Sequence, residues 1–151
     1  KLGLVGSEMC IRDRYIAELI KENKIKPEPW MDEDVTYHDP CYLGRHSNEY
    51  DAPRDVIQSI MRDGKLVEME QSKRESFCCG AGGGNMWYEI KTGERINKYR
   101  FNQAVETKAK TVAAACNFCN IMLEDGMKVT GNDKDMQVLD IAEMVSKGLS
   151  K

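Results

Sequence analysis

The sequence predicts an α/β fold, a Rossmann-like layered domain with a short, mostly parallel sheet flanked by helices. Short apolar runs that suit buried strands alternate with longer segments whose apolar residues recur at helical spacing. Single helices between successive strands imply right-handed crossovers, which leave the strands parallel. The 151 residues are enough for one domain with its own core.

The first half of the chain supplies two predicted helices and two predicted strands. Residues 15–24 carry a helical apolar stripe that ends before Pro27 and Pro29. Residues 35–38 form a strand closed by the Asp-Pro pair at 39–40. A helix follows over 53–62, with Pro53 at its first position and Gly64 after its end. Residues 65–69 return as a strand.

The second half repeats this alternation after a glycine-rich segment. A long helical pattern includes Ile96, Tyr99, Ala104 and Val105 among its apolar positions. The run TVAAA at 111–115 suits a buried strand, and helix is expected over 118–127. A short strand at 137–139 and an amphipathic helix at 141–149 complete the domain.

Composition excludes some classes of partner. The net charge is −3 and the sequence has no block of Lys and Arg, so no nucleic-acid partner is expected. No apolar run approaches the ~20 residues that a membrane-spanning helix needs. The sequence is 41% hydrophobic and 31% charged, the balance of a globular domain.

The first residues differ in character from the remainder. Residues 1–14 (KLGLVGSEMCIRDR) have no initiator Met, no signal-peptide pattern and no clear amphipathic period. The stretch GSEMCIRDR resembles a read-through translation found at the ends of assembled environmental sequences. We therefore interpret 1–14 as a non-native or truncated lead-in, with 15–151 as the domain. Cys10 is excluded from the predicted site.

The other cysteines fall into three groups with equal gaps. Thirty-six residues separate Cys41 from Cys78, and 36 separate Cys79 from Cys116, which begins a C-x-x-C motif ending at Cys119. Each group follows a predicted strand. Ligands of parallel sheets bind beyond the carboxyl ends of the strands, so the three groups are expected to meet there.

Local chemistry at each group suits a metal centre. In the C-x-x-C motif one turn presents both thiolates to a common centre. The adjacent Cys78 and Cys79 would point to opposite faces of a strand, so convergence requires an irregular turn. The glycines that follow permit such a turn, and their N–H groups can donate to cluster sulfides. These predicted cofactor-binding glycines are Gly80, Gly82, Gly83 and Gly84.

Several kinds of cysteine site compete. Disulfides would leave one of five cysteines unpaired. Structural zinc takes four ligands, and fits if one cysteine is not a ligand. A redox pair at Cys116 and Cys119 would leave three cysteines unexplained. A polynuclear iron–sulfur cluster can use five thiolates, one of them bridging two irons, and sulfur ligands suit it.

Neighbouring residues are assigned lesser roles. The glycines match neither the Rossmann nor the P-loop motif, so a nucleotide site is not predicted. His38 and His46 flank Cys41 and are each a candidate ligand or proton relay, although His46 more simply bonds backbone or water. Trp87 and Tyr88 shield the cluster or simply pack.

From residue 37 to residue 149 the chain resembles the cysteine-rich CCG domain family, which includes heterodisulfide reductases, glycolate oxidase iron–sulfur subunits and membrane-bound iron–sulfur reductases. The resemblance is carried by HDPC at 38–41, FCCGAGGG at 77–84 and CNFC at 116–119. It implies a noncubane [4Fe-4S] cluster held by five cysteines: Cys41, Cys78, Cys79, Cys116 and Cys119. HDPCYLGRH at 38–46 and ERIN at 94–97 are most similar to the membrane-bound reductases.

The resemblance also implies a function and partners. Such relatives relay electrons from a flavoprotein dehydrogenase or electron-transfer flavoprotein towards quinone, and thiol or disulfide reduction at the cluster is the alternative. Family members usually carry a second CCG domain and a ferredoxin-like module. We therefore expect an oxidoreductase fragment, the C-terminal domain of a longer protein, inactive alone. The expected location is cytoplasmic, on the cytoplasmic membrane face if the missing part provides an anchor.

Overall fold

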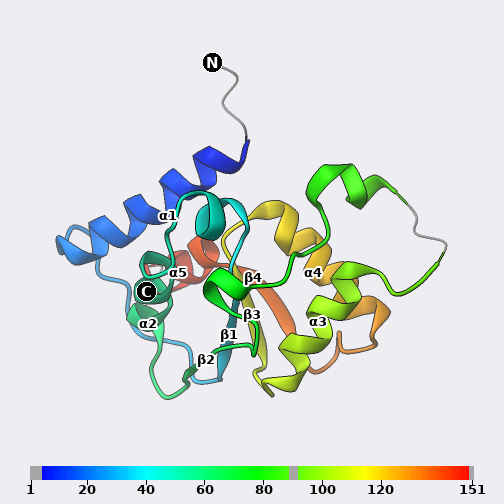
Figure 1. Cartoon of the computed structure of the whole chain (residues 1–151). Coiled ribbons are helices and arrows are strands. Elements are labelled where there is room, and N and C mark those ends of the chain that lie inside the picture. The colour runs from blue at the N-terminus through cyan, green and yellow to red at the C-terminus, as the bar shows by residue number, and fades with distance from the viewer. Residues whose placement is uncertain (1–4, 89–91, 150–151) are drawn as a thin grey trace.

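The computed structural model describes residues 5–88 and 92–149, with side chains from residue 11 onward (Figure 1). Its helices are α1 (Val5–Lys21), α2 (Ala52–Ile60), α3 (Ile96–Glu106), α4 (Asn117–Val129) and α5 (Ile141–Leu149). Its strands are β1 (Val35–His38), β2 (Leu66–Val67), β3 (Thr111–Ala114) and β4 (Gln137–Asp140). None of the described helices is long and apolar enough to cross a membrane.

The sheet confirms the predicted fold class. Its four strands lie in the order β2-β1-β3-β4, and every pairing is parallel. Val35 lies opposite Thr111 and His38 opposite Ala114, so the two central strands end together. Their carboxyl ends therefore form one edge from which the following loops leave the sheet.

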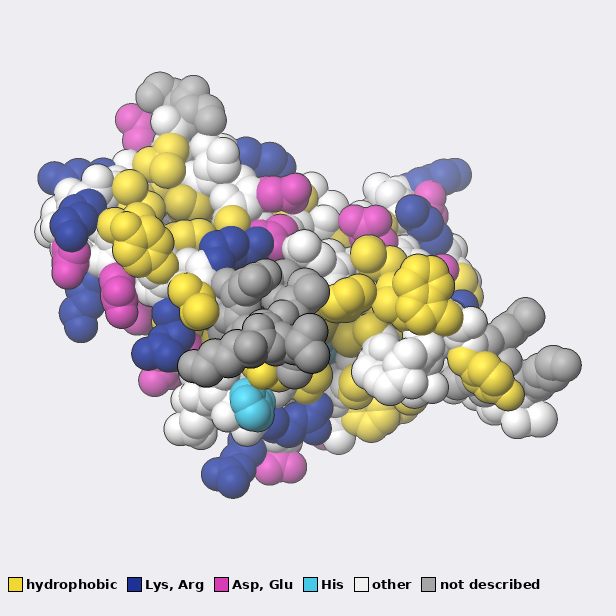
Figure 2. Space-filling view, turned by 90° about the horizontal axis from the view of Figure 1, so that it is seen from above, with side chains coloured by type: hydrophobic (Ala, Val, Ile, Leu, Met, Phe, Trp, Pro, Cys, Tyr) yellow, Lys and Arg dark blue, Asp and Glu magenta, His cyan; other side chains and the backbone are white. Residues whose placement is uncertain are grey.

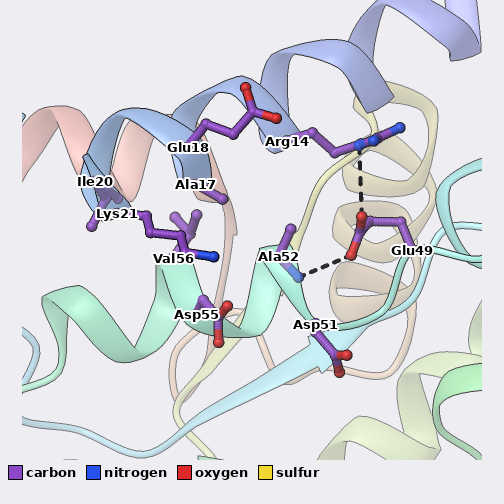
Figure 3. A pocket seen from close by; sticks show the side chains of 10 residues that line it. All are labelled: Arg14, Ala17, Glu18, Ile20, Lys21, Glu49, Asp51, Ala52, Asp55 and Val56. Atoms are coloured by element: carbon purple, nitrogen blue, oxygen red, sulfur yellow. Dashed lines mark hydrogen bonds and ion pairs between the residues drawn. The ribbon is translucent and has the colours of Figure 1, made fainter. Parts of the chain in front are cut away.

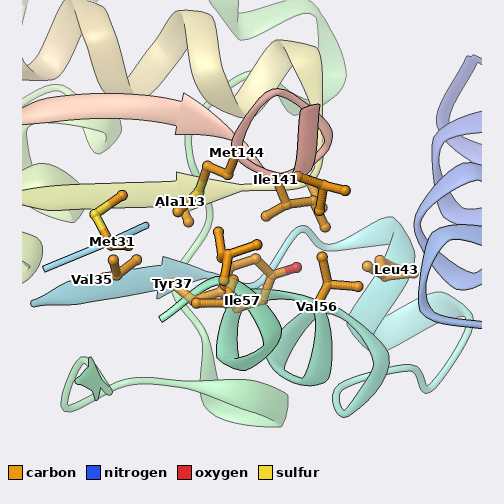
Figure 4. Packing of buried hydrophobic residues seen from close by; sticks show 12 residues of the cluster. Met31, Val35, Tyr37, Leu43, Val56, Ile57, Ala113, Ile141 and Met144 are labelled. Carbon is orange, nitrogen blue, oxygen red and sulfur yellow. The ribbon is translucent and has the colours of Figure 1, made fainter. Parts of the chain in front are cut away.

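Helices cover both faces of the sheet. In Figure 1, α1, α2 and α5 lie on one side and α3 and α4 on the other. Alternate residues of β3 pack against the helices on opposite faces of the sheet, because successive side chains of a strand point to opposite faces. Ala113 packs with the α2 and α5 side chains shown in Figure 4, whereas Val112 and Ala114 pack with α3 and α4. All residues of β1 and β3 are buried, as expected of a covered parallel sheet.

The α1 helix differs from its predicted bounds. It begins at Val5, ten residues before the predicted start, and ends at Lys21, after which Asn23 adopts a positive φ of 57°. Residues 1–4 and the side chain of Cys10 lie outside the described part of the chain. A continuous helix does not decide whether 1–14 is native, so the lead-in stays a prediction.

The Asp13 carboxylate is an unfavourable feature of this segment. Its side chain is fully buried, one oxygen accepts a 2.8 Å hydrogen bond from Arg12, and the other has no partner among the described residues. Burial raises the pKa of Asp13 to about 6 from its ordinary value of 3.8, and the nearby Asp140 charge adds to that rise, while Arg12 opposes it.

This raised pKa predicts a pH-dependent cost of stability. The folded protein holds the Asp13 proton more tightly than the unfolded chain does, so stability falls as pH rises from about 4 to about 6. In the unsubstituted chain, Asp13 should lower the free energy of unfolding by roughly 2–3 kcal/mol between pH 3.5 and pH 7. Asp13→Asn should remove this part of the pH dependence. Urea unfolding at both pH values measures the difference. An identical pH dependence in both proteins would contradict the assignment.

Candidate metal centre

Five cysteines meet at the carboxyl edge of the sheet. One cavity of about 340 Å³ is lined by Cys41, Cys78, Cys79, Cys116 and Cys119. Cys41 follows β1 and Cys116 follows β3, and the shared register of these strands brings the two loops side by side. The predicted meeting of three cysteine groups is therefore present. Whether the five thiols are metal ligands stays a prediction.

An ion pair fixes the backbone that leads into Cys41. The guanidinium of Arg54 donates to both carboxylate oxygens of Asp39, at 2.7 and 2.9 Å, and also to Glu68. Burial alone would lower the pKa of Arg54, but its hydrogen bonds to Glu68 and Asp39 raise it. Arg54 is therefore a fixed cation, and the β1 end is tied to α2.

The same aspartate holds the second cysteine loop. The backbone N–H of Lys73 donates to Asp39 at 2.7 Å, and the Ser76 hydroxyl donates to the Asp39 carbonyl at 3.3 Å. These bonds bring the segment after β2 back over the end of β1. Cys78 and Cys79 follow directly, in irregular backbone as the adjacent pair requires.

The C-x-x-C motif lies at the start of α4. Cys116 is the extended residue before the first helical turn, with φ −141° and ψ 124°, and Cys119 is buried within that turn. The Sγ atoms of Cys119 and Cys79 are 3.3 Å apart, longer than a disulfide bond. Two of the three groups are therefore in direct contact.

Shared protons make the thiols unequal. Hydrogen bonds from the thiols of Cys119 and Cys78 hold the pKa of Cys79 far below its ordinary range. A hydrogen bond from Cys119 lowers the pKa of Cys116 to about 7, and backbone N–H donors of the first helical turn add to that shift. Thiolates are the form that binds metal, so Cys79 is already a soft anionic donor, whereas the raised pKa values of Cys78 and Cys119 keep these two as thiols.

His38 lies beneath these sulfurs. One of its ring nitrogens and the Sγ atoms of Cys79 and Cys119 lie within 4.8 Å of one another. Its Nδ1 accepts a 3.0 Å hydrogen bond from Arg100 Nε, and its Nε2 is buried with no hydrogen-bond partner among the described residues. Burial lowers the pKa of His38, which favours the neutral ring.

Two of the four predicted cofactor-binding glycines, Gly82 and Gly84, are among the residues that line the cavity, and Gly80 and Gly83 are not. The Gly80 N–H donates to Cys78 Sγ at 3.3 Å. Gly83 and Gly84 have φ of 66° and 77°, a region that side chains disfavour. Contact between these glycines and a cofactor stays a prediction.

Other predicted residues have mixed outcomes. His46 is exposed, its ring packs in a tilted arrangement against Tyr42 with centroids 4.4 Å apart, and it is not among the residues that line the cavity. Trp87 lines the cavity yet remains 84% exposed, so it forms a rim rather than a cover. Tyr88 is not among the residues that line the cavity. Sequence reasoning missed Arg100, since an arginine in a helix normally indicates a solvated face.

Hydrophobic side chains surround the cavity on its outer side. Met86, Trp87 and Phe118 line it, and Phe118 is 40% exposed. Figure 2 views the molecule from above, and hydrophobic side chains gather both on its left side, where Figure 1 places α1, and on its right side, where Figure 1 places α3 and α4. The site is therefore an apolar-rimmed, sulfur-lined hollow at the protein surface.

A larger cavity of about 550 Å³ lies between α1 and α2 (Figure 3). Its wall carries charges of both signs, and Glu49 there accepts from the Ala52 N–H at 3.1 Å and pairs with Arg14 at 3.6 Å. No cysteine or histidine of the described residues lines it. The smaller cavity, which the five cysteines line, is therefore the candidate metal centre.

The donor set suits an iron–sulfur group. All five candidate donors are soft sulfurs, which iron–sulfur clusters select over oxygen ligands. The partnerless Nε2 of His38 is buried beside two of them, so the site also provides an N–H that a sulfur can accept. A tetrahedral zinc ion would use only four of these donors.

Fold and site together define a cysteine-rich α/β domain that gathers thiols at the carboxyl edge of a parallel sheet. The family model described as CCG, cysteine-rich domain, matches residues 35–124. The chain belongs to this CCG cysteine-rich domain family.

Several curated relatives are similar to most of this chain. It is 40% identical over 142 residues to the probable iron-sulfur-binding oxidoreductase FadF of Bacillus subtilis, covering 94% of this chain and 20% of the relative. It is 38% identical to the EtfAB:quinone oxidoreductase of Syntrophomonas wolfei, covering 89% and 20%. It is 40% identical to a subunit of the dihydromethanophenazine:CoB--CoM heterodisulfide reductase of Methanosarcina barkeri, covering 97% and 36%. The chain thus spans about a fifth to a third of these relatives.

Gly82 and Gly83 provide a matched pair for the glycine loop. A Cβ on either would meet nothing within 4 Å, but only Gly83 has a positive φ. Gly83→Ala should therefore destabilise the loop by about 1–2 kcal/mol, whereas Gly82→Ala should change stability little. Denaturant unfolding of both variants measures this. Equal losses would show that backbone conformation at Gly83 is not the constraint.

Proposed function

We propose that this chain is the iron–sulfur cluster-binding, electron-transfer domain of an oxidoreductase. The observation that supports this most is the convergence of five thiols on one cavity of about 340 Å³. Relatives whose names include an iron-sulfur-binding oxidoreductase and an EtfAB:quinone oxidoreductase support the same class of function. When bound, a cluster of this kind accepts and passes on single electrons.

The proposed cofactor is a noncubane [4Fe-4S] cluster held by the five cysteines. Cys79 has two sulfur neighbours in the protein, Cys119 at 3.3 Å and the adjacent Cys78. Cys79 would therefore hold the cluster together with its two sulfur neighbours, whereas a mononuclear zinc site would use only four of the five thiolates. Structural zinc at four of the cysteines is the second candidate, favoured by the closeness of the Cys79 and Cys119 sulfurs.

Chain residues would then position the cluster and limit its solvation. Asp39 and Arg54 hold the loop that carries Cys41, and the first turn of α4 holds Cys116 and Cys119. Cys79 and Cys119 are 5% and 2% exposed, while Cys41 is exposed. Electrons would therefore enter or leave on the Cys41 side, where the protein barrier is thinnest.

Partners follow from the same proposal. The donor would be a flavoprotein dehydrogenase or electron-transfer flavoprotein and the acceptor a quinone or other carrier, in keeping with one relative's name. The chain spans only part of its relatives, and the family resemblance supports the proposal that the full-length protein carries a second CCG domain and a ferredoxin-like module. The parent is proposed to work in the cytoplasm or on the cytoplasmic face of a membrane.

Thiol or disulfide reduction at the cluster is the competing activity. The heterodisulfide reductase relative supports it, whereas five sulfur donors leave little room for an exchangeable ligand, which favours relay. A redox titration followed by EPR, with and without an added thiol, separates the two. A signal that appears on reduction and is unchanged by thiol supports relay. A signal that forms only with thiol under oxidising conditions would overturn it.

Cysteine substitutions test the ligand set directly. Cys79→Ser should abolish or convert the cluster, because a serine oxygen binds iron–sulfur irons poorly. Cys10→Ser is the matched control, since Cys10 lies outside the proposed set, and it should leave the visible absorption and EPR signal unchanged. Equal cluster content in Cys79→Ser and in the unsubstituted 151-residue chain would exclude Cys79 as a ligand.

A further inference from the structure

Arg100 is a buried cation without a carboxylate partner among the described residues. It lies in α3, its relative exposure is 0%, and no carboxylate in the described part of the chain lies within 4 Å of its guanidinium. Burial lowers the pKa of Arg100 to about 10, which still leaves it charged at neutral pH. A buried charge of this kind is costly unless opposite charge lies nearby.

The acceptors of Arg100 are all neutral. Its guanidinium donates to the Gln71 carbonyl at 2.9 Å, to the Gln103 amide at 2.6 Å and to the Ser76 hydroxyl at 3.1 Å. Its Nε–H donates to His38 Nδ1 at 3.0 Å. By contrast, the similarly buried Arg54 donates hydrogen bonds to the carboxylates of Asp39 and Glu68.

Negative charge reaches Arg100 from the cysteine side. Asp39, Cys119 and Cys79 are the groups whose negative charge would raise the pKa of Arg100, and of the two cysteines only Cys79 has its own pKa lowered. Asp39 is bonded to Arg54 and not to Arg100, so the Cys79 thiolate is the negative charge on the cysteine side that, with Asp39, offsets the charge of Arg100. His38 lies between the two, with Arg100 at its Nδ1 and the sulfurs near its ring.

We propose that Arg100 is a positioning residue of the metal centre, which holds His38 in the tautomer with its proton on Nε2 so that this N–H donates to the Cys79 sulfur. The inference rests on the proposed cluster. Arg100 has only donors, so the Nδ1 that it faces must present a lone pair. In the neutral ring the single proton is then on Nε2, a buried atom with no hydrogen-bond partner among the described residues, and Cys79 and Cys119 are the potential acceptors grouped with this ring.

This tautomer excludes His38 as a metal ligand. Together with Cys79 and Cys119 it forms a group with metal-binding spacing. A ligating histidine, however, coordinates through a bare nitrogen and donates its other N–H to an acceptor. Here His38 Nδ1 accepts a hydrogen bond from Arg100, so it carries no proton to donate. Coordination of a metal through Nε2 would then require loss of the remaining ring proton, which would leave an imidazolate. His38 therefore supports the sulfurs without replacing one of them.

The expected consequence is a higher reduction potential. A hydrogen bond to a ligand sulfur and a buried positive charge both favour the more negative, reduced state of a cluster. Replacing Arg100 removes both the positive charge and the hydrogen bond that sets the His38 tautomer, so it should lower the midpoint potential of the cluster. If the hydrogen bond between Arg100 and His38 only stabilised the fold, its loss would lower the free energy of unfolding and leave the midpoint potential unchanged.

The tautomer is measurable without any cluster. In the reduced, metal-free 151-residue chain labelled with ¹⁵N-histidine, NMR should show the His38 proton on Nε2 and a bare Nδ1. Arg100→Met should lose this preference. A proton on Nδ1 in the parent chain would overturn the proposal, whatever metal the protein binds.

The potential is measured on the iron–sulfur-loaded chain by redox titration with EPR. Arg100→Met should shift the reduction equilibrium at least tenfold, about 59 mV lower for one electron. Arg100→Lys, which keeps the charge, should shift it less. Asn97→Ala removes another buried polar side chain of α3, which bonds Met122 and Asp125 instead, and should not shift it. Equal potentials in parent and Arg100→Met would overturn the proposal.

His38 variants separate hydrogen bonding from ligation. His38→Phe should bind as much iron as the unsubstituted chain but have a lower midpoint potential. His38→Gln, which restores an N–H donor, should recover part of the difference in potential. Strong nitrogen hyperfine coupling from labelled His38 in the parent would instead show ligation and overturn the proposal. If the parent chain takes up no iron and sulfide, the cluster proposal fails, and the NMR measurement still decides the tautomer. If Arg100→Met fails to fold, Arg100→Lys and the parent NMR decide.

Discussion

Four successive residue pairs join β1 to β3 in parallel, from Val35 opposite Thr111 to His38 opposite Ala114. Because the strands end level with each other, the chain leaves both at the same edge and carries Cys41 and Cys116 to one place. Slipping this register by one residue would turn every strand side chain to the opposite layer. The two helical layers, which accept alternate residues of β3, therefore protect the geometry of the site.

Asp39 extends this constraint to the third cysteine group. Its carboxylate receives Arg54 from α2 and the Lys73 N–H from the segment before Cys78. A buried aspartate with these donors is satisfied, and it joins segments that lie far apart in the sequence. Arg100 works beside it on the α3 side, where Ser76 links the two sets of hydrogen bonds. Two buried arginines thus lie beside the cysteine loops, Arg54 paired with carboxylates and Arg100 bonded to His38.

Much of this architecture could be predicted from sequence because it follows from periodicity and spacing. The β1 bounds and the α5 bounds agree with the predicted ranges, and equal cysteine gaps after successive strands indicated a common edge. The start of α1 was wrong by ten residues, because residues 5–14 have no clear apolar period yet continue the helix. Arg100 left no signal, since its burial depends on Gln71, Ser76 and His38 from distant segments. Long-range polar partners of this kind are not encoded in local patterns.

The central claim is that the five thiols hold an iron–sulfur cluster. Analysis of iron, zinc and acid-labile sulfide in the anaerobically purified chain tests it most directly. We predict about four irons and about four sulfides per chain, with brown colour and little zinc, as a [4Fe-4S] group requires. About one zinc per chain with no sulfide, in a colourless preparation, would contradict the account.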